Sequence, residues 1–190
     1  MNDANESAEA RNSDTPDIRD AIDADVPAIR AIYAHHVLSG VASFEEAPPS
    51  VDEMRARRAA VLKRGLPYLV AELDGSVAGY AYASPYRPRA AYRHTIEDSI
   101  YVADAFRGRG VGSALLAALI ERCETGPWRQ MIAVVADGGR SGSMSLHRCL
   151  GFELIGTLKA VGFKHGRWID TALMQRTLGA GSTALPDDPV

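Results

Sequence analysis

The segment 107–113 is a glycine-rich turn whose spacing suits the binding of an anion. Gly108, Gly110 and Gly112 precede a long apolar stretch with helical period. Because glycine has no Cβ, a ligand can approach the backbone closely, and free N–H groups at the start of a helix can converge on it. The spacing therefore predicts a pyrophosphate held by main-chain amides.

Two adjacent carboxylates, Glu97 and Asp98, lie in an extended pattern just before this turn. Side chains alternate between the two faces of a strand, so only one of the pair can face a given cleft. A carboxylate positioned at a cleft can accept a proton from an ammonium group. The alternation places Thr95, Glu97, Ser99 and Tyr101 on one face and Ile96, Asp98, Ile100 and Val102 on the other.

The composition limits the class of protein. The 190 residues are 46% hydrophobic, enough for one domain with a core, and the formal net charge is −3. Since no block of Lys and Arg is present, we expect no nucleic-acid partner. The chain has neither an apolar run of roughly 20 residues nor a signal-peptide pattern, which predicts no membrane partner and a cytoplasmic location. Cys123 and Cys149 are expected to be buried free thiols.

The elements that must position these residues follow from hydrophobic periodicity. Residues 1–15 and 178–190 have the composition of disordered tails, which leaves 16–177 as one folded domain. Asp25 predicts a helix start before Pro27, and Ser50 with Glu53 predicts a capping box on a second helix. Further helices are expected from 111 to near 125 and at 141–150. Strands are expected at 18–21, 68–73, 77–82, 94–102, 131–135, 152–161 and 167–175, with 131–135 covered on both faces. This order predicts an α/β fold with a mixed sheet.

Two motifs carry a resemblance to a known family. Arg107-Gly108-Arg109-Gly110-Val111-Gly112 follows a strand and opens a helix, and Leu150-Gly151-Phe152 ends a later helix. Together they resemble the GNAT superfamily of N-acetyltransferases. The resemblance implies a mostly antiparallel twisted sheet flanked by helices, with acetyl-CoA as the acetyl donor and no metal. A Rossmann unit instead has its glycine turn after the first strand of a βαβ unit, whereas here the turn is mid-chain.

Two further segments narrow the resemblance. Residues 42–45 and, above all, 162–170 resemble the phosphinothricin and methionine sulfoximine N-acetyltransferases, and the similarity covers roughly 17–176. It implies a small amino-acid amine as acceptor and a homodimer. The guanidinium groups of Arg87 and Arg89 lie on one side of a short extended segment, which suits the binding of a carboxylate or phosphinate. The alternative is that this segment is a solvated basic loop. The substrate positions implied by the resemblance are Phe44, Arg87, Arg89, Tyr92 and Tyr101.

The resemblance also implies roles in the reaction. An amine attacks a thioester only when neutral, so a base is useful, and Glu97 stands at the general base's position. The Val102 N–H stands where the oxyanion is stabilised. His147 stands where many members carry a tyrosine that protonates the leaving thiolate, and it serves as that acid, as a substrate contact or as a structural residue. The coenzyme-binding positions are Tyr101, Val102, Arg107, Gly108, Arg109, Gly110, Val111, Gly112, Ser113, Arg140 and Ser143.

The chain departs from the family pattern at Arg140, where an asparagine that contacts CoA is common. Arg140 either reaches a CoA phosphate or belongs to a loop that bends differently. His35 and His36 are adjacent on a helix and cannot share one metal face, so no metal site is expected. Two other functions stay open: acetylation of a protein amine, and CoA binding without turnover. An amine screen with acetyl-CoA separates the three.

Overall fold

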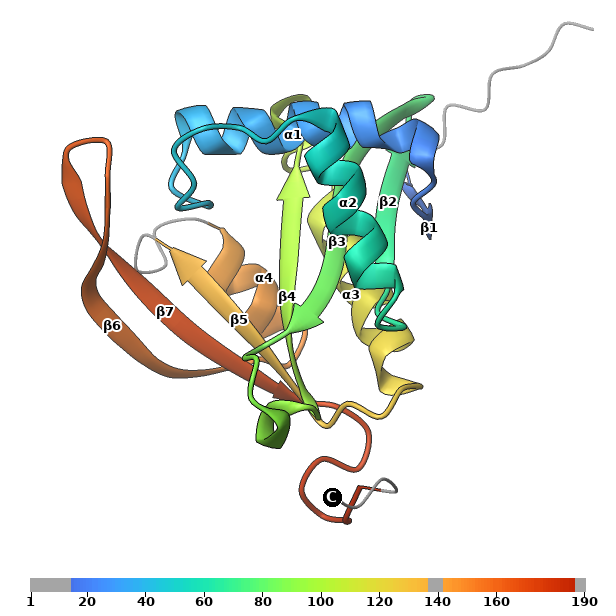
Figure 1. The fold of residues 1–190 in the computed structure, drawn as a ribbon, viewed down its shortest axis with the longest axis vertical. Coiled ribbons are helices and arrows are strands. Elements are labelled where there is room, and N and C mark those ends of the chain that lie inside the picture. The colour runs from blue at the N-terminus through green and yellow to red at the C-terminus, as the bar shows by residue number, and fades with distance from the viewer. Residues whose placement is uncertain (1–14, 137–141, 187–190) are drawn as a thin grey trace, which may run out of the picture.

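The computed structural model describes residues 15–136 and 142–186, and these form a seven-stranded sheet with helices on both faces (Figure 1). The strand order is β1-β2-β3-β4-β5-β7-β6, and only the β4–β5 pair is parallel. This confirms the predicted mixed, mostly antiparallel fold. The elements are β1 (Asp17–Asp20), α1 (Val26–Ser39), α2 (Val51–Leu62), β2 (Tyr68–Leu73), β3 (Ser76–Pro85), β4 (Thr95–Val102), α3 (Val111–Glu124), β5 (Gln130–Ala136), α4 (Ser143–Cys149), β6 (Glu153–Lys164) and β7 (Arg167–Thr177).

The helices cover the sheet in two layers, with α1 and α2 on one face and α3 and α4 on the other (Figure 1). The predicted alternation along β4 is confirmed by the contacts on each side. Tyr101 packs edge-on against Tyr33 of α1, with ring centroids 5.0 Å apart. Asp98, on the opposite face, contacts His147 of α4. The face of Glu97 is therefore the α1/α2 face.

Helix α3 packs closely on β3 because Gly79 has no side chain. A Cβ at Gly79 would lie 2.9 Å from the Tyr101 carbonyl oxygen and 3.1 Å from side-chain atoms of Val111 and Leu115. The inner face of α3 is fully apolar, as its four-residue spacing predicts. The glycine turn that begins this helix is thus fixed against the end of β4.

Strands β4 and β5 diverge after a short paired stretch. They pair at Thr95–Gln130, Ile96–Met131 and Glu97–Ile132, and no further pair follows within the described residues. From Asp98 to Val102 the β5-facing edge of β4 is without a ladder partner, and the two strands separate visibly (Figure 1). Glu97 lies at the last paired position, where the strands begin to diverge.

Both predicted helix starts are correct to within a residue, but the capping contacts differ. Ser50 Oγ accepts from the Glu53 N–H at 3.1 Å, while the Glu53 carboxylate pairs with Arg57 instead of returning to the cap. Asp25 precedes α1 but makes no capping bond; it accepts from Ile22 N–H and pairs with Arg19. An arginine within reach outcompetes a backbone N–H for a carboxylate because both partners are charged.

Three burial predictions need correction. Strand β5 is not covered on both faces: Val134 is 43% exposed, because α1 and α2 pack mainly on β2, β3 and β4. Cys149 is exposed, whereas Cys123 is buried as expected. Leu178, assigned to the C-terminal tail, is fully buried in the core.

Among the described residues, none of the helices combines the length and apolarity that a membrane span requires.

Candidate active site

The glycine turn forms an open backbone cradle at the start of α3. Gly108 and Gly110 have φ of +76° and +78°, which L-residues with a Cβ rarely adopt, and nothing lies within 4 Å of where their side chains would be. Gly110 is the residue before the helix, and no side chain caps it. The first N–H groups of α3 are therefore available to an anion, which fits a diphosphate.

Side chains around the turn hold it in place. Arg107 pairs with Asp104 at 2.7 Å, and Arg109 pairs with Asp74 at 2.8 Å. Val111 is buried in the core, while Ser113 is exposed one position after Gly112. The two arginines thus anchor the turn to neighbouring segments and keep positive charge beside it.

Gly112 connects the turn to the strand end and to α4. A Cβ there would lie 3.4 Å from Leu146 of α4 and 3.7 Å from Val102 of β4. The predicted coenzyme positions at 101–102, 107–113 and 143 consequently come from three elements that meet at one place. Arg140 lies outside the described residues.

Glu97 is a half-buried carboxylate that no other group neutralises. Among the described residues it makes no hydrogen bond and no ion pair. Burial, with a smaller contribution from the adjacent Asp98 carboxylate, raises the pKa of Glu97 to about 7. A carboxylate with a pKa near neutrality can accept a proton and release it again at physiological pH.

The neighbours of Glu97 on its face come from β3. The cross-strand partner of Glu97 is Ser84. Ser99, two residues further along β4 on the same face, pairs with Tyr82. Residues directly opposite in an antiparallel pair share a face and lie close together. Glu97 therefore faces a surface made of hydroxyl groups and aromatic rings, and carries the only carboxylate of β4 on that side.

His147 is buried on the other face and is engaged at both ring nitrogens. Nε2 lies 3.1 Å from Asp98 Oδ2, and Nδ1 lies 2.7 Å from the Ser143 carbonyl oxygen. A carbonyl and a carboxylate both accept hydrogen bonds, so this arrangement suits a ring that carries hydrogen on both nitrogens. Burial alone would lower the pKa of His147, but the contact with Asp98 outweighs it and the pKa is raised. Of the three roles considered for His147, this geometry favours the structural one.

His36 is a residue that the sequence reading left without a role. Its Nε2 donates to the Val102 carbonyl oxygen at 3.0 Å, and its ring packs against Tyr101. Burial lowers the pKa of His36, which favours the neutral ring. This contact fixes the end of β4 where the oxyanion donor is predicted. The only signal in the sequence was the position of His36 on the apolar stripe of its helix.

The predicted substrate residues do not form one cluster. Arg87 stacks on Tyr86 and Tyr92, with its guanidinium carbon 5.1 and 5.8 Å from their ring centroids, and both Arg87 and Arg89 are exposed. Phe44 is 46% exposed and lies against Gly162 of β6, where a Cβ would come within 2.5 Å of its ring. Within the described chain, no contact joins Phe44 to Arg87, Arg89 or Tyr92.

The loop that carries Phe44 is held by contacts that were not predicted. Tyr33 Oη lies 2.8 Å from Ser43 Oγ and donates to Glu45 at 2.9 Å. Lys164 of β6 donates to the Ser43 carbonyl oxygen at 2.6 Å, a buried contact. These bonds connect α1, the loop and β6, so Phe44 has a defined position. No group of three or more His, Cys, Asp or Glu within the described residues could hold a metal.

Comparison with known proteins finds relatives that match most of the chain. The chain is 62% identical over 170 residues to a phosphinothricin N-acetyltransferase of Alcaligenes faecalis, which covers 90% of this chain and 86% of that protein. It is 43% identical to an L-methionine sulfoximine/L-methionine sulfone acetyltransferase of Pseudomonas paraeruginosa, over 85% of this chain and 94% of that one.

A solved structure matches the fold over nearly its whole length. A phosphinothricin acetyltransferase from Sinorhizobium meliloti, in complex with acetyl-CoA, has a TM-score of 0.88 and 52% identity, over 93% of this chain and 95% of that chain. Residues 29–152 match the acetyltransferase (GNAT) family. With the family match covering more than half of the sequence and relatives this similar, the chain belongs to the acetyltransferase (GNAT) family.

Proposed function

We propose that this protein transfers the acetyl group of acetyl-CoA to the α-amine of a small amino acid of the phosphinothricin, methionine sulfoximine or methionine sulfone type. The observation that carries the proposal is Glu97: a carboxylate without a partner, with a pKa of about 7, at the position where β4 and β5 diverge. The named substrates of the relatives support the choice of acceptor.

In the proposed reaction Glu97 takes one proton from the substrate ammonium, directly or through a water. Acetyl-CoA supplies a thioester carbonyl that the neutral amine attacks. The amides at Gly110 to Ser113 hold the diphosphate, and a β4 main-chain N–H, assigned to Val102, donates to the developing oxyanion. The attacking nitrogen then gives up a second proton to solvent, and the tetrahedral intermediate expels the CoA thiolate to leave the amide. The thiolate takes up one proton to give free CoA.

The proton that the CoA thiolate takes up does not come from Glu97. His147 was considered as the acid, but its two N–H groups already donate to Asp98 and Ser143. We infer that His147 fixes α4 against β4, and that the thiolate takes its proton from solvent. A His147→Gln variant that keeps its rate at saturating acetyl-CoA supports this, while a drop in rate of a hundredfold or more restores the acid role.

The acceptor is tested by a screen with acetyl-CoA. Phosphinothricin, methionine sulfoximine, methionine sulfone, unmodified amino acids and peptides with free N-termini are compared by thiol release, with the acetylated product identified by mass. Preferential turnover of the first three is the expected result. Preference for peptides in direct competition favours the protein-amine alternative, and tight CoA binding without thiol release from any amine indicates a binding module.

We further propose a cytoplasmic homodimer that binds no nucleic acid. Strand β6 is an edge strand whose apolar side chains are exposed, among them Ile155 at 60% and Phe163 at 58%. A second copy would remove this surface from water. Light scattering of the purified protein tests the mass, and a monomer across micromolar concentrations contradicts the dimer. The need for acetyl-CoA supports the location, and the net charge of −3 supports the absence of a nucleic-acid partner.

A further inference from the structure

His36 takes the place of a strand partner at the end of β4. The ladder between β4 and β5 ends at the Glu97–Ile132 pair, so β5 supplies no hydrogen bond to Val102 within the described residues. His36 Nε2 lies 3.0 Å from the Val102 carbonyl oxygen, the acceptor that a neighbouring strand would otherwise use. Because a carbonyl shielded from water is costly without a partner, this side chain of α1 satisfies the main chain where the sheet opens.

The hydrogen bonds between β3 and β4 show which way the main-chain groups of Val102 point. The Ala103 N–H donates to the Ala78 carbonyl oxygen at 2.9 Å, and Val102 lies opposite Gly79 in the same register. Since alternate residues of an antiparallel pair bond to the partner strand, Ala103 bonds to β3 and Val102 directs both its N–H and its C=O away from β3. The Val102 N–H therefore lies on the same edge as the carbonyl that His36 holds.

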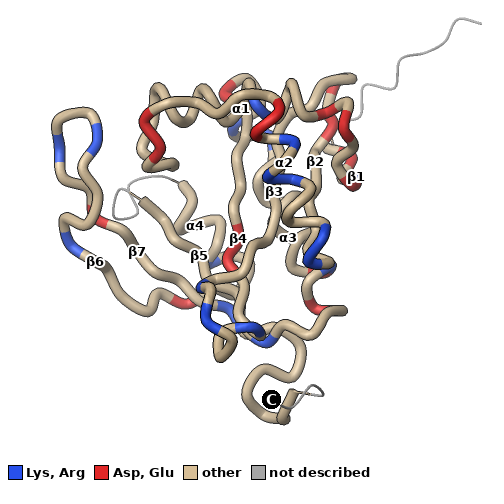
Figure 2. The backbone as a smooth tube through the Cα atoms, viewed as in Figure 1, with Lys and Arg blue, Asp and Glu red and all other residues tan. Residues whose placement is uncertain are grey.

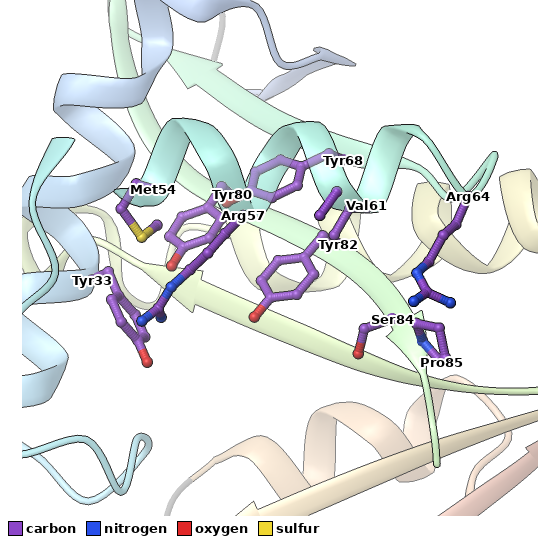
Figure 3. Close-up of a pocket in the computed structure, with 11 residues that line it drawn as sticks. Tyr33, Met54, Arg57, Val61, Arg64, Tyr68, Tyr80, Tyr82, Ser84 and Pro85 are labelled. Carbon is purple, nitrogen blue, oxygen red and sulfur yellow. The ribbon is translucent and has the colours of Figure 1, made fainter. Parts of the chain in front are cut away.

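Aromatic contacts hold the ring of His36 in this orientation. Its centroid lies 5.4 Å from that of Tyr101, and Tyr33, about one turn earlier on α1, packs edge-on against the same tyrosine at 5.0 Å. Figure 3 shows Tyr33 beside Arg57 at one end of the pocket under α2. Two side chains of one helix thus pack on the residue that precedes Val102, which restricts rotation of the imidazole away from the strand.

The ring of His36 donates this bond in its neutral form. Of the Lys, Arg, Asp and Glu types, α1 carries a single residue, Arg30 (Figure 2). The carboxylate of Asp104 is paired with the neighbouring His35 at 2.6 Å. Burial lowers the pKa of His36. A neutral imidazole has one N–H, and because a carbonyl oxygen only accepts, that hydrogen is on Nε2.

We propose that His36 is a positioning residue for acetyl transfer, which holds the edge of β4 so that the Val102 N–H meets the thioester oxygen of acetyl-CoA. The inference rests on the proposed function and deepens it, because the same N–H is the proposed oxyanion donor. Such a donor is effective only when it points at the position where negative charge develops. A displaced strand end therefore weakens binding of the transition state more than binding of the coenzyme. His36 itself acts through the main chain of Val102.

Substitutions that keep or remove the donor test this role. His36→Leu is expected to lower kcat by about tenfold to a hundredfold and to leave the Kd of CoA, measured by calorimetry, within about twofold. In His36→Gln the amide nitrogen reaches about as far as Nε2, so kcat should stay within about threefold of the wild type. His36→Asn is one methylene shorter and should resemble His36→Leu.

His94→Leu is the matched control, because it removes the same kind of bond at the opposite end of β4. His94 Nδ1 lies 3.0 Å from the Pro127 carbonyl oxygen. We expect this variant to keep the wild-type kcat. A loss of kcat in His94→Leu as large as in His36→Leu would show that any loosening of β4 has the same result, and would overturn the specific role of His36.

An infrared measurement separates alignment of the donor from a purely structural contribution. Difference spectra of acetyl-CoA labelled with ¹³C at the carbonyl report how strongly the bound thioester is polarised. We expect a lower carbonyl stretching frequency than in water for the wild type, His36→Gln and His94→Leu, and a return toward the value in water for His36→Leu and His36→Asn. Equal losses of kcat and of the frequency shift in the Leu and Gln variants would overturn the role of the hydrogen bond.

Failure of this role and failure of the proposed function are distinguishable. Turnover of methionine sulfone by the wild type, with kcat and carbonyl frequency unchanged in His36→Leu, removes the role of His36 and leaves the function. If no amine is turned over, the infrared spectra still test His36, because they need no acceptor. If His36→Leu does not fold, His36→Gln and His36→Asn carry the same comparison: a frequency shift kept in Gln and lost in Asn supports the role, and equal frequencies contradict it.

Discussion

Glu97 and Asp98 are consecutive carboxylates on β4, and they face opposite sides of the sheet in different surroundings. Asp98 is buried and bonded to His147, 49 positions later in the sequence. Glu97 is half-buried with no such partner, and its pKa is raised to about 7. A buried carboxylate that is paired with a residue of another element holds the two elements together. A partly buried carboxylate without a partner has a raised pKa, so near neutral pH it can both take up and release a proton. β4 thus places a carboxylate that joins two elements on one face of the sheet, and the carboxylate that we propose as the base on the other.

Removing the Glu97 carboxylate should have the largest effect. Glu97→Gln is isosteric but cannot accept a proton, and loss of a general base usually costs about 10²- to 10⁴-fold in rate. We expect kcat at pH 7 to fall by at least about a hundredfold, with CoA affinity unchanged. Thiol-release kinetics measure this effect. Glu121→Gln, on the exposed side of α3, is the matched control, and a wild-type rate in Glu97→Gln would remove the base assignment.

Asp98→Asn should instead act on stability. Breaking one side of a buried ion pair typically costs 3–5 kcal/mol, and we expect a loss of about 3 kcal/mol in the free energy of unfolding. Because the pKa of His147 is raised in the folded state, the contribution of the pair is fully present below the ordinary histidine pKa and is lost as pH rises through the folded value. Urea unfolding at pH 6 measures the loss. An unchanged urea midpoint in Asp98→Asn would show that the Asp98–His147 pair does not stabilise the fold.

The pH profile sharpens the comparison further. A base with a pKa of about 7 must be ionised, so kcat/KM should fall about tenfold per pH unit below 7 and level off above it. In Glu97→Gln the break should move to the pKa of the free amine, between about 8 and 10. A wild-type profile that breaks only in that higher range contradicts the role of Glu97.

The smallest expected effect is on the stability of Glu97→Gln. Because the folded pKa of Glu97 is raised, the folded state holds more protons than the unfolded state between about pH 4.5 and 7, and stability falls as pH rises through that window. The Gln variant should escape this loss and be more stable than the wild type at pH 8 by about 1 kcal/mol, since solvent screens the half-exposed group. Equal pH dependence of the two unfolding curves would contradict the raised pKa.

Local patterns in the sequence determined much of the fold and part of the site. Period-two alternation separated Glu97 from Asp98, and the glycine spacing located the turn with positive φ at Gly108 and Gly110. These features depend on backbone sterics and on neighbours a few positions away, which a sequence shows directly. The four-residue apolar spacing of α3 likewise predicted which side of that helix is buried.

Only the tertiary structure decided which groups meet and what charge they carry. Asp98 finds His147, Val102 finds His36, and Tyr80 is left without a partner because of how α4, α1 and α2 pack on the sheet. The exposure of Val134 and the burial of Leu178 depend on the same packing. Desolvation and pairing act through distance in space, so the pKa of Glu97 and the state of His147 follow from the assembled fold and not from the order of residues.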